Sequence, residues 1–228
     1  MFLVGLTGGI ATGKSTASNM FRRLGAYVIE ADQVSRDVVK PGLPAWCKIR
    51  EEFGGDVFLE DGQLNREEMG RIIFSDSTRR KQLNAITHPE IRKAILWQLL
   101  ICFLKGYQFV ILDIPLLFET RSMLSLLSFI IVISCTERQQ LQRLMARNGF
   151  SKEEAESRIK SQMPLTEKCR MANYVVDNSG TEEMTEKQIV DLFRKFNRSK
   201  LHWPIRILGW TVIAFFVWII AKLVNLFL

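Results

Sequence analysis

Short apolar runs recur along the chain and alternate with stretches that read as helices. The runs at 2–6, 27–29, 109–113, 128–134 and 174–178 are rich in Val, Ile, Leu and Phe and predict strands. Helices are predicted between them, for example over 16–24, 33–39 and 183–196. Strands that read as continuous apolar runs and alternate with helices are typical of a buried parallel sheet. The pattern therefore predicts an α/β fold with helices flanking a parallel sheet.

The first run leads directly into a glycine-rich loop that matches G-x-x-x-x-G-K-S between Gly8 and Ser15. A strand before such a loop and a helix after it are the context of a phosphate-binding loop, in which backbone N–H groups face a polyphosphate. Lys14 is expected to reach the β- and γ-phosphates, and the Ser15 hydroxyl to bind Mg²⁺. The predicted ATP-binding residues of the loop are Gly8, Gly9, Ile10, Ala11, Thr12, Gly13, Lys14, Ser15 and Thr16.

Polar residues follow three of the other predicted strands. Asp32 comes just after the strand at 27–29, where a carboxylate could take a proton from an attacking hydroxyl; the alternative is that it caps the next helix. Asp113 ends a buried strand in the manner of a carboxylate that holds Mg²⁺ or water. Asn178 could border the nucleotide base or simply begin a turn. These positions predict chemistry at one edge of the sheet.

Residues 41–105 have few strand signals and read as a helical region that receives the second substrate. Arg66, Lys81 and His88 are its polar candidates for substrate contacts, although for each one taken singly an ordinary solvated or structural role is favoured. Pro89 follows His88 and is expected in the first turn of a long helix that ends near Leu104.

Two helices joined by a Gly-containing turn are predicted within 136–165, each opened by a capping box. Arg143 and Arg147 lie four residues apart and so share one face of the first helix. In an isolated segment these would be solvent-facing charges. Next to a phosphate loop, they favour a lid that closes over the nucleotide and brings positive charge to the transferring phosphoryl group.

Composition narrows the possible partners. The chain has 228 residues and a formal net charge of +7, which suits an acidic ligand or surface. No basic run is interleaved with aromatic residues, so a nucleic-acid partner is not expected. The four cysteines are widely spaced and predict neither a disulfide framework nor a zinc site.

The C-terminal segment is strongly apolar. After a basic linker at 197–206, the fifteen residues 207–221 carry no charge, and apolar character continues beyond Lys222 to the end. Together 207–228 have about the ~20 residues that cross a bilayer. The segment predicts a transmembrane tail anchor with the catalytic domain facing the cytosol, at the mitochondrial outer membrane or the endoplasmic reticulum. The alternative is a hydrophobic helix packed on the core or in a dimer contact.

Several longer motifs occur together. They are the phosphate loop with Gly5-Leu-Thr before it, Glu30-Ala-Asp32, His88-Pro89, Leu112-Asp-Ile-Pro-Leu-Leu-Phe-Glu119, Gln142-Arg-Leu-Met-Ala-Arg-Asn-Gly149, Arg158-Ile-Lys-Ser-Gln-Met-Pro164 and Val176-Asp-Asn-Ser-Gly180. In this order they resemble the dephospho-CoA kinases over about residues 1–195. The family usually has Asp where this chain has Glu30, and many members have Glu where it has Asn84, which leaves the acceptor-side contacts open.

The resemblance implies a P-loop kinase fold over residues 1–196 and transfer of the ATP γ-phosphate to the ribose 3′-hydroxyl of dephospho-CoA, the final step of CoA synthesis. By position it implies that Asp32 is the general base, that Lys14 and Ser15 bind phosphate and Mg²⁺, and that Arg143 and Arg147 are lid arginines. Two other functions stay open: a kinase for a different nucleotide-type acceptor, and a non-catalytic, membrane-tethered nucleotide-binding module. The oligomeric state is also open.

Overall fold

The computed structural model describes residues 1–121 and 123–201, and beyond these only 203–204, 207–211, 214–215, 218–219 and 222. The chain forms two compact units. One combines residues 1–28 with 102–228, and the other consists of residues 29–101. Each unit is described by itself below.

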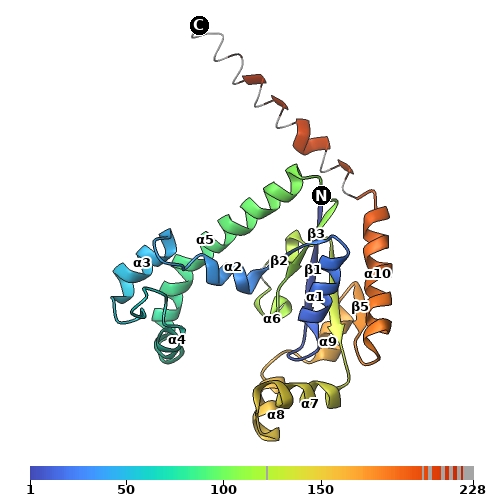
Figure 1. Ribbon diagram of the computed structural model, residues 1–228. Coiled ribbons are helices and arrows are strands. Elements are labelled where there is room, and N and C mark those ends of the chain that lie inside the picture. Colours follow the sequence, from blue (N-terminus) through green and yellow to red (C-terminus); the bar gives the residue numbers. More distant parts are fainter. Residues whose placement is uncertain are drawn as a thin grey trace. The chain divides into compact units, whose positions relative to one another are not determined.

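A five-stranded sheet is the centre of the first unit (Figure 1). Its strands are β1 Phe2–Gly8, β2 Tyr27–Glu30, β3 Phe109–Asp113, β4 Phe129–Ser134 and β5 Tyr174–Asp177, in the order β2-β3-β1-β4-β5. The pairs β1–β3, β1–β4 and β4–β5 are parallel. The α/β fold with a parallel sheet, predicted from the apolar runs, is thus confirmed. With β3 and β4 on its two sides, β1 lies at the middle of the sheet, and its C-terminal end leads into the glycine-rich loop.

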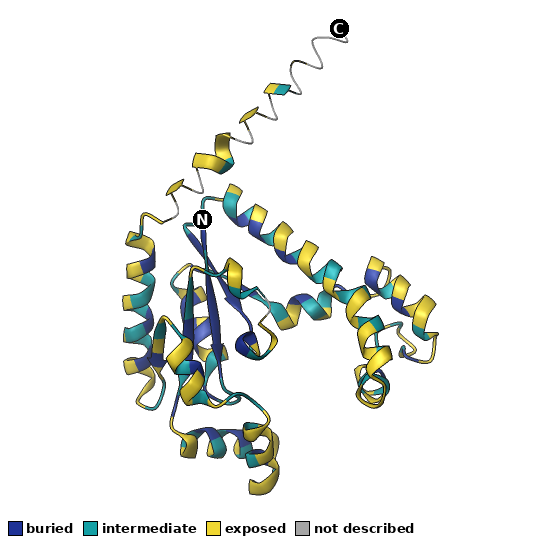
Figure 2. Cartoon of the chain, turned by 180° about the vertical axis from the view of Figure 1, so that it is seen from behind, coloured by how far each residue is buried: buried dark blue, intermediate teal, exposed yellow. Residues whose placement is uncertain are grey.

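Helices of the first unit flank the sheet and leave β1 and β3 almost fully buried, whereas the outer strands β2 and β5 are partly exposed (Figure 2). They are α1 Lys14–Arg23, α6 Leu117–Thr120, η1 Leu124–Leu126, α7 Glu137–Asn148, α8 Lys152–Lys160, α9 Leu165–Met171 and α10 Glu182–Arg198. The helices α1 and α10 pack against each other. Capping boxes start α7 at Thr136 and α8 at Ser151, as the sequence predicted, and Gly149 ends α7 with a positive φ of 69°.

An aromatic cluster fills one end of the sheet. Phe2, Phe109, Phe129 and Tyr174 are the first residues of their strands, and all four rings contact Phe196 of α10. Because the paired strands are parallel, their first residues lie at the same edge. The aromatic side chains are therefore concentrated at that edge, while Asp113 ends β3 and Asn178 follows β5 at the opposite, C-terminal edge.

The second unit is helical, with α2 Ala31–Asp37, α3 Pro44–Phe53, α4 Arg66–Ser75 and most of α5 Ser77–Leu104. The expected helix start at Pro89 is wrong, since α5 runs through it as one helix of 28 residues. A proline inside a helix removes one backbone hydrogen bond and crowds the carbonyl four residues earlier. Here the helix continues on both sides of the proline, and buried Ile95, Leu99 and Cys102 anchor its second half.

The predicted membrane anchor is contradicted. Among the residues that the structure describes, no helix is long and apolar enough to span a membrane. Most of the segment 207–228 on which the prediction rested lies outside the described residues. The predicted location of the protein, at the mitochondrial outer membrane or the endoplasmic reticulum, is therefore contradicted as well.

Candidate functional site

The loop between β1 and α1 has the geometry of a phosphate cradle. Gly13 caps α1 with φ 92°, a left-handed conformation that suits glycine, and Ala11 also has a positive φ of 60°. Within the loop, both the backbone N–H and the hydroxyl of Thr12 donate to the carbonyl of Gly9, at 3.3 and 2.9 Å. The helix then starts at Lys14, so its free N–H groups point toward the loop, where an anion is favoured.

Lys14 and Asp113, both predicted site residues, are brought together. The ammonium group of Lys14 pairs with Oδ1 of Asp113, whose side chain is only 4% exposed. The other carboxylate oxygen accepts a 2.6 Å hydrogen bond from the hydroxyl of Ser18, which sequence reasoning missed. Ser18 lies one turn of α1 after Lys14, on the buried face of the helix. The carboxylate of Asp113 therefore holds the ammonium group of Lys14 at the C-terminal edge of the sheet.

The donor set fits Mg²⁺. Among the described residues, each oxygen of Asp113 accepts a hydrogen bond from one donor and keeps a further lone pair, and the hydroxyl of Ser15 lies in the exposed first turn of α1. Mg²⁺ takes hard oxygen ligands and is usually held by one or two carboxylates together with substrate phosphates and water. The described residues contain no cluster of three or more His, Cys, Asp or Glu side chains that could hold a metal ion by themselves.

Asn178 and Arg143 brace the loop from the other side. The amide of Asn178 donates to the carbonyl of Thr12 at 2.8 Å, and the hydroxyl of Thr185 donates to its amide oxygen at 2.9 Å. Arg143 donates from Nη2 to the carbonyl of Asn178 at 3.0 Å, while its Nη1 is buried without a partner among the described residues. Arg147, by contrast, is exposed and donates to the side chain of its neighbour Asn148 at 2.8 Å. The two predicted lid arginines thus have different surroundings.

Gly13→Ala tests this packing. A Cβ at Gly13 would lie 2.1 Å from Nδ2 of Asn178, whereas the same change at Gly149, also at positive φ, meets nothing within 4 Å. Both variants place an L-residue at a positive φ, which costs roughly 1–2 kcal/mol, so the difference between them reports mainly the clash with Asn178. We expect Gly13→Ala to weaken ATP binding at least tenfold and Gly149→Ala to leave it within twofold, as measured by equilibrium titration. Equal affinities would show that Asn178 moves aside without consequence.

Two glutamines of the predicted lid, neither of them among the predicted site residues, hold the backbone of Ile10. Gln140 of α7 donates to the carbonyl of Ile10 at 2.8 Å, and the side chain of Gln162, after α8, accepts from its N–H at 2.9 Å. Gln140 also lies over Gly9, where a Cβ would approach its Nε2 to 2.6 Å. Both ends of the predicted lid are therefore attached to the same residue of the phosphate loop.

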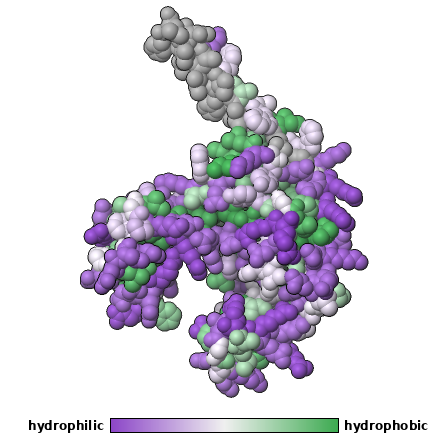
Figure 3. Space-filling view, in the orientation of Figure 1, coloured by the Kyte–Doolittle hydropathy of each residue, from purple (hydrophilic) through white to green (hydrophobic). Residues whose placement is uncertain are grey.

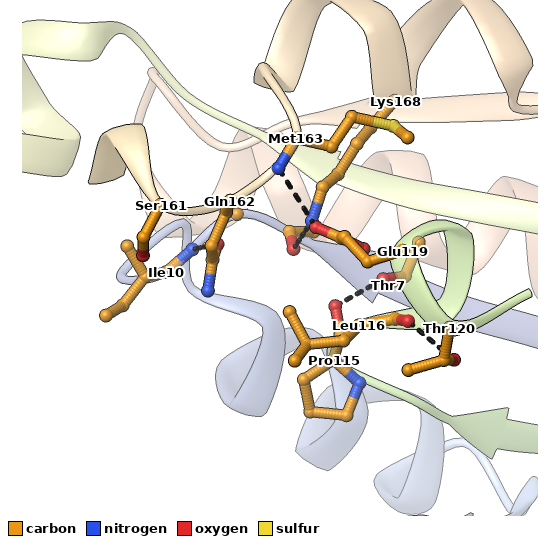
Figure 4. A network of polar contacts seen from close by, with 12 residues as sticks. Thr7, Ile10, Pro115, Leu116, Glu119, Thr120, Ser161, Gln162, Met163 and Lys168 are labelled. Carbon is orange, nitrogen blue, oxygen red and sulfur yellow. Dashed lines mark hydrogen bonds and ion pairs between the residues drawn. The ribbon is translucent and has the colours of Figure 1, made fainter. Parts of the chain in front are cut away.

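An ion pair between a fully buried lysine and a partly exposed glutamate lies beside these contacts (Figure 4). Lys168 of α9 has no exposed side-chain surface; its ammonium group is 2.7 Å from Oε1 of Glu119 and donates to the carbonyl of Gly8 at 3.3 Å. Burial raises the pKa of Glu119, but the hydrogen bond and charge of Lys168, with backbone N–H donors, outweigh it and leave that pKa lowered. Lys168 shares a helix face with Leu165 and Cys169, a spacing from which its inward position could have been predicted.

The remaining predicted residues lie in the second unit. Asp32 is exposed in the first turn of α2, with Glu30 at the N-cap. Arg66 starts α4 and lines a pocket of about 440 Å³ together with Arg36 and Lys40, which were not predicted, and two acidic residues, Asp37 and Asp61. Lys81 and His88 are exposed positions of α5 and are not among the lining residues of that pocket.

Comparison with known proteins agrees with this architecture. Residues 2–183 match the family model of dephospho-CoA kinases. The chain is 50% identical over 197 residues to the dephospho-CoA kinase domain-containing protein of Danio rerio, covering 86% of each chain. It is 46% identical over 194 residues to the dephospho-CoA kinase of Carboxydothermus hydrogenoformans, covering 85% of this chain and 94% of the relative.

A solved structure supports the same assignment. The dephospho-CoA kinase of Campylobacter jejuni is 28% identical with a TM-score of 0.64, and the match covers 85% of this chain and 96% of that one. The resemblance inferred from the motifs is confirmed. This chain belongs to the dephospho-CoA kinase family.

Proposed function

We propose that the protein transfers the γ-phosphoryl group of ATP to the ribose 3′-hydroxyl of dephospho-CoA and so produces CoA. The observation that carries this proposal is the phosphate loop with its Lys14–Asp113 pair, in a chain whose relatives bear the name dephospho-CoA kinase. In the reaction the 3′-oxygen bonds to the γ-phosphorus, the bond from that phosphorus to the β,γ-bridging oxygen breaks, and ADP leaves. The hydroxyl proton passes to Asp32.

Residues of the first unit neutralise the charge on the nucleotide. Lys14 and the N–H groups at the start of α1 face the phosphates, and Asn178 borders the loop at Gly13. The unpartnered Nη1 of Arg143 is a buried donor that an anionic group would satisfy, while exposed Arg147 is free to move with the predicted lid. Mg²⁺, held by Ser15 and Asp113, would supply further charge neutralisation at the phosphates.

The second unit receives the acceptor. The pocket that Arg66 lines also has Arg36 and Lys40, and their three cationic groups outnumber the two carboxylates of Asp37 and Asp61. Such a pocket suits the anionic phosphates of dephospho-CoA. Lys81 and His88, exposed on α5, remain proposed contacts to other parts of the acceptor. Asp32 precedes this pocket on α2 and is proposed as the general base.

The test is ATP-dependent phosphorylation by the purified full chain, with dephospho-CoA, AMP and CMP as acceptors and CoA measured by chromatography. We expect turnover with dephospho-CoA that exceeds turnover with either nucleotide by at least 100-fold. Preference for AMP or CMP would establish a different small-molecule kinase. ATP binding without turnover on any acceptor would instead establish a non-catalytic nucleotide-binding protein.

A further inference from the structure

The ion pair of Lys168 and Glu119 joins three segments that are far apart in the sequence. Lys168 is in α9, Glu119 in α6, and the carbonyl of Gly8 ends β1 where the phosphate loop begins. Oε1 of Glu119 also accepts a 3.2 Å hydrogen bond from the N–H of Met163, the residue after Gln162 (Figure 4). One buried cation therefore has contacts to the phosphate loop and, through a carboxylate, to the last residues of the predicted lid.

The burial of this lysine is unusual for the molecule. Hydrophilic side chains dominate the face shown in Figure 3. Of the lysines that the structure describes, Lys168 alone is buried. A lysine is rarely fully buried unless it is paired, and a buried ion pair is often no more stabilising than apolar residues of similar size. Fold stability alone therefore does not explain well why a charged residue occupies this buried position. A role in fixing the geometry between the joined segments explains it better.

The contacts of Lys168 and Gln162 bear on the geometry of the phosphate loop. Gly8 and Ile10 are two residues apart: Lys168 holds the carbonyl of Gly8, and Gln162 holds the N–H of Ile10. Met163, next to Gln162, is held by Glu119, which Lys168 holds in turn. The contacts form a closed ring from the loop through the end of the predicted lid and back to the loop.

We propose that Lys168 is a positioning residue for phosphoryl transfer, whose buried ammonium group keeps the phosphate loop and residues 162–163 in register. This inference rests on the proposed kinase function. Lys168 acts through the backbone of Gly8 and through Glu119, and a small displacement of phosphate-binding groups is enough to cost about 100-fold in rate.

Two variants separate positioning from stability. Lys168→Met removes the cation and leaves the carboxylate of Glu119, which is 22% exposed, with backbone N–H donors such as that of Met163 but no countercharge from Lys168. In the double variant Lys168→Met/Glu119→Leu neither charge remains, so the cost of leaving one charge without its partner is removed. We expect urea unfolding midpoints to fall in the single variant and to recover largely in the double variant. In both variants we expect kcat to stay ten- to 100-fold below that of the wild type, with a raised KM for ATP.

Arg170→Met is the matched control, because Arg170 is an exposed cation on the same helix α9. Its kcat and KM for ATP are expected to stay within twofold of the wild type. Its urea unfolding midpoint is expected to equal that of the wild type within error. If kcat of the double variant recovers in parallel with its stability, Lys168 is only structural and the proposal fails. Unchanged kcat in Lys168→Met would overturn it as directly.

Hydrogen–deuterium exchange provides a readout that does not need catalysis. In Lys168→Met we expect faster exchange at the N–H groups of Ile10 and Met163, with the centre of β3 unchanged. Uniformly faster exchange, including β3, would indicate global destabilisation and count against the proposal. If the wild type fails to phosphorylate dephospho-CoA, the proposed function fails, yet the exchange pattern still decides whether Lys168 couples the two segments.

Discussion

Asp32→Asn is expected to retain ATP binding and to lose most turnover. An amide is nearly isosteric with the carboxylate but cannot accept the hydroxyl proton, and loss of a general base costs on the order of 10²- to 10⁴-fold in rate. Because the base acts late in a loose transition state, we expect the smaller end of this range, about 100-fold in kcat. Single-turnover kinetics with dephospho-CoA, together with an ATP titration, measure the two effects separately.

The matched control for this variant is Asp56→Asn, which changes another exposed carboxylate of the same compact unit. Its kcat and its ATP affinity are expected to stay within twofold of the wild type. Asp32 also lies in the first turn of α2, where a negative charge stabilises the helix by ~0.3–1 kcal/mol. A small fall in stability is therefore expected in Asp32→Asn. Full turnover in this variant would remove Asp32 from the mechanism and leave it as a helix-terminal residue.

Lys14→Met is expected to impair both ATP binding and turnover. The variant removes the cation that we propose faces the phosphates, and it leaves the carboxylate of Asp113, 4% exposed, with the hydroxyl of Ser18 as a remaining donor. Loss of one donor to a developing charge costs about 10²- to 10³-fold, and we expect kcat/KM for ATP to fall by at least 100-fold. Isothermal titration with ATP and steady-state kinetics check the two parts.

Lys14→Arg is the comparison that separates charge from geometry. It keeps the positive charge, but the planar guanidinium group replaces a compact ammonium group in contact with Asp113 and the loop. We expect it to recover ATP binding to within about tenfold of the wild type and to recover kcat less fully. A urea unfolding midpoint for each variant accounts for the uncompensated charge of Asp113. Wild-type ATP affinity in Lys14→Met would contradict the role of Lys14 in the phosphate site.

Several site features were accessible from local sequence. The glycine-rich loop, the strand before it and the helix after it lie within consecutive residues, and the backbone conformation of Gly13 follows from its place before Lys14. The capping boxes at Thr136 and Ser151 also depend only on residues three positions apart. Asp113 was singled out because a buried strand ends there, and its role in the site stays a prediction. Predictions such as the capping boxes succeed because the interactions that decide them are short in sequence.

Other features depended on long-range contacts and were missed or wrongly predicted. Ser18 was missed because its partner Asp113 is 95 residues away, and the roles of Gln140 and Gln162 on Ile10 span 130 and 152 residues. Pro89 was expected to begin a helix because local propensity disfavours proline inside one, yet α5 continues through it. The membrane anchor was predicted from the hydropathy of the C-terminal segment alone. No helix among the described residues is long and apolar enough to span a membrane.

The sequence by itself determined the α/β class, the phosphate loop and the family, because apolar periodicity, glycine conformations and ordered motifs are properties of nearby residues. Tertiary structure decided which side chains support that loop. Lys168 is 160 residues from Gly8 and becomes its partner only when α9 packs beside the end of β1. A buried charge requires a partner, and the fold brings Glu119 to Lys168, so that an unremarkable lysine of a short helix becomes part of the support for the phosphate loop.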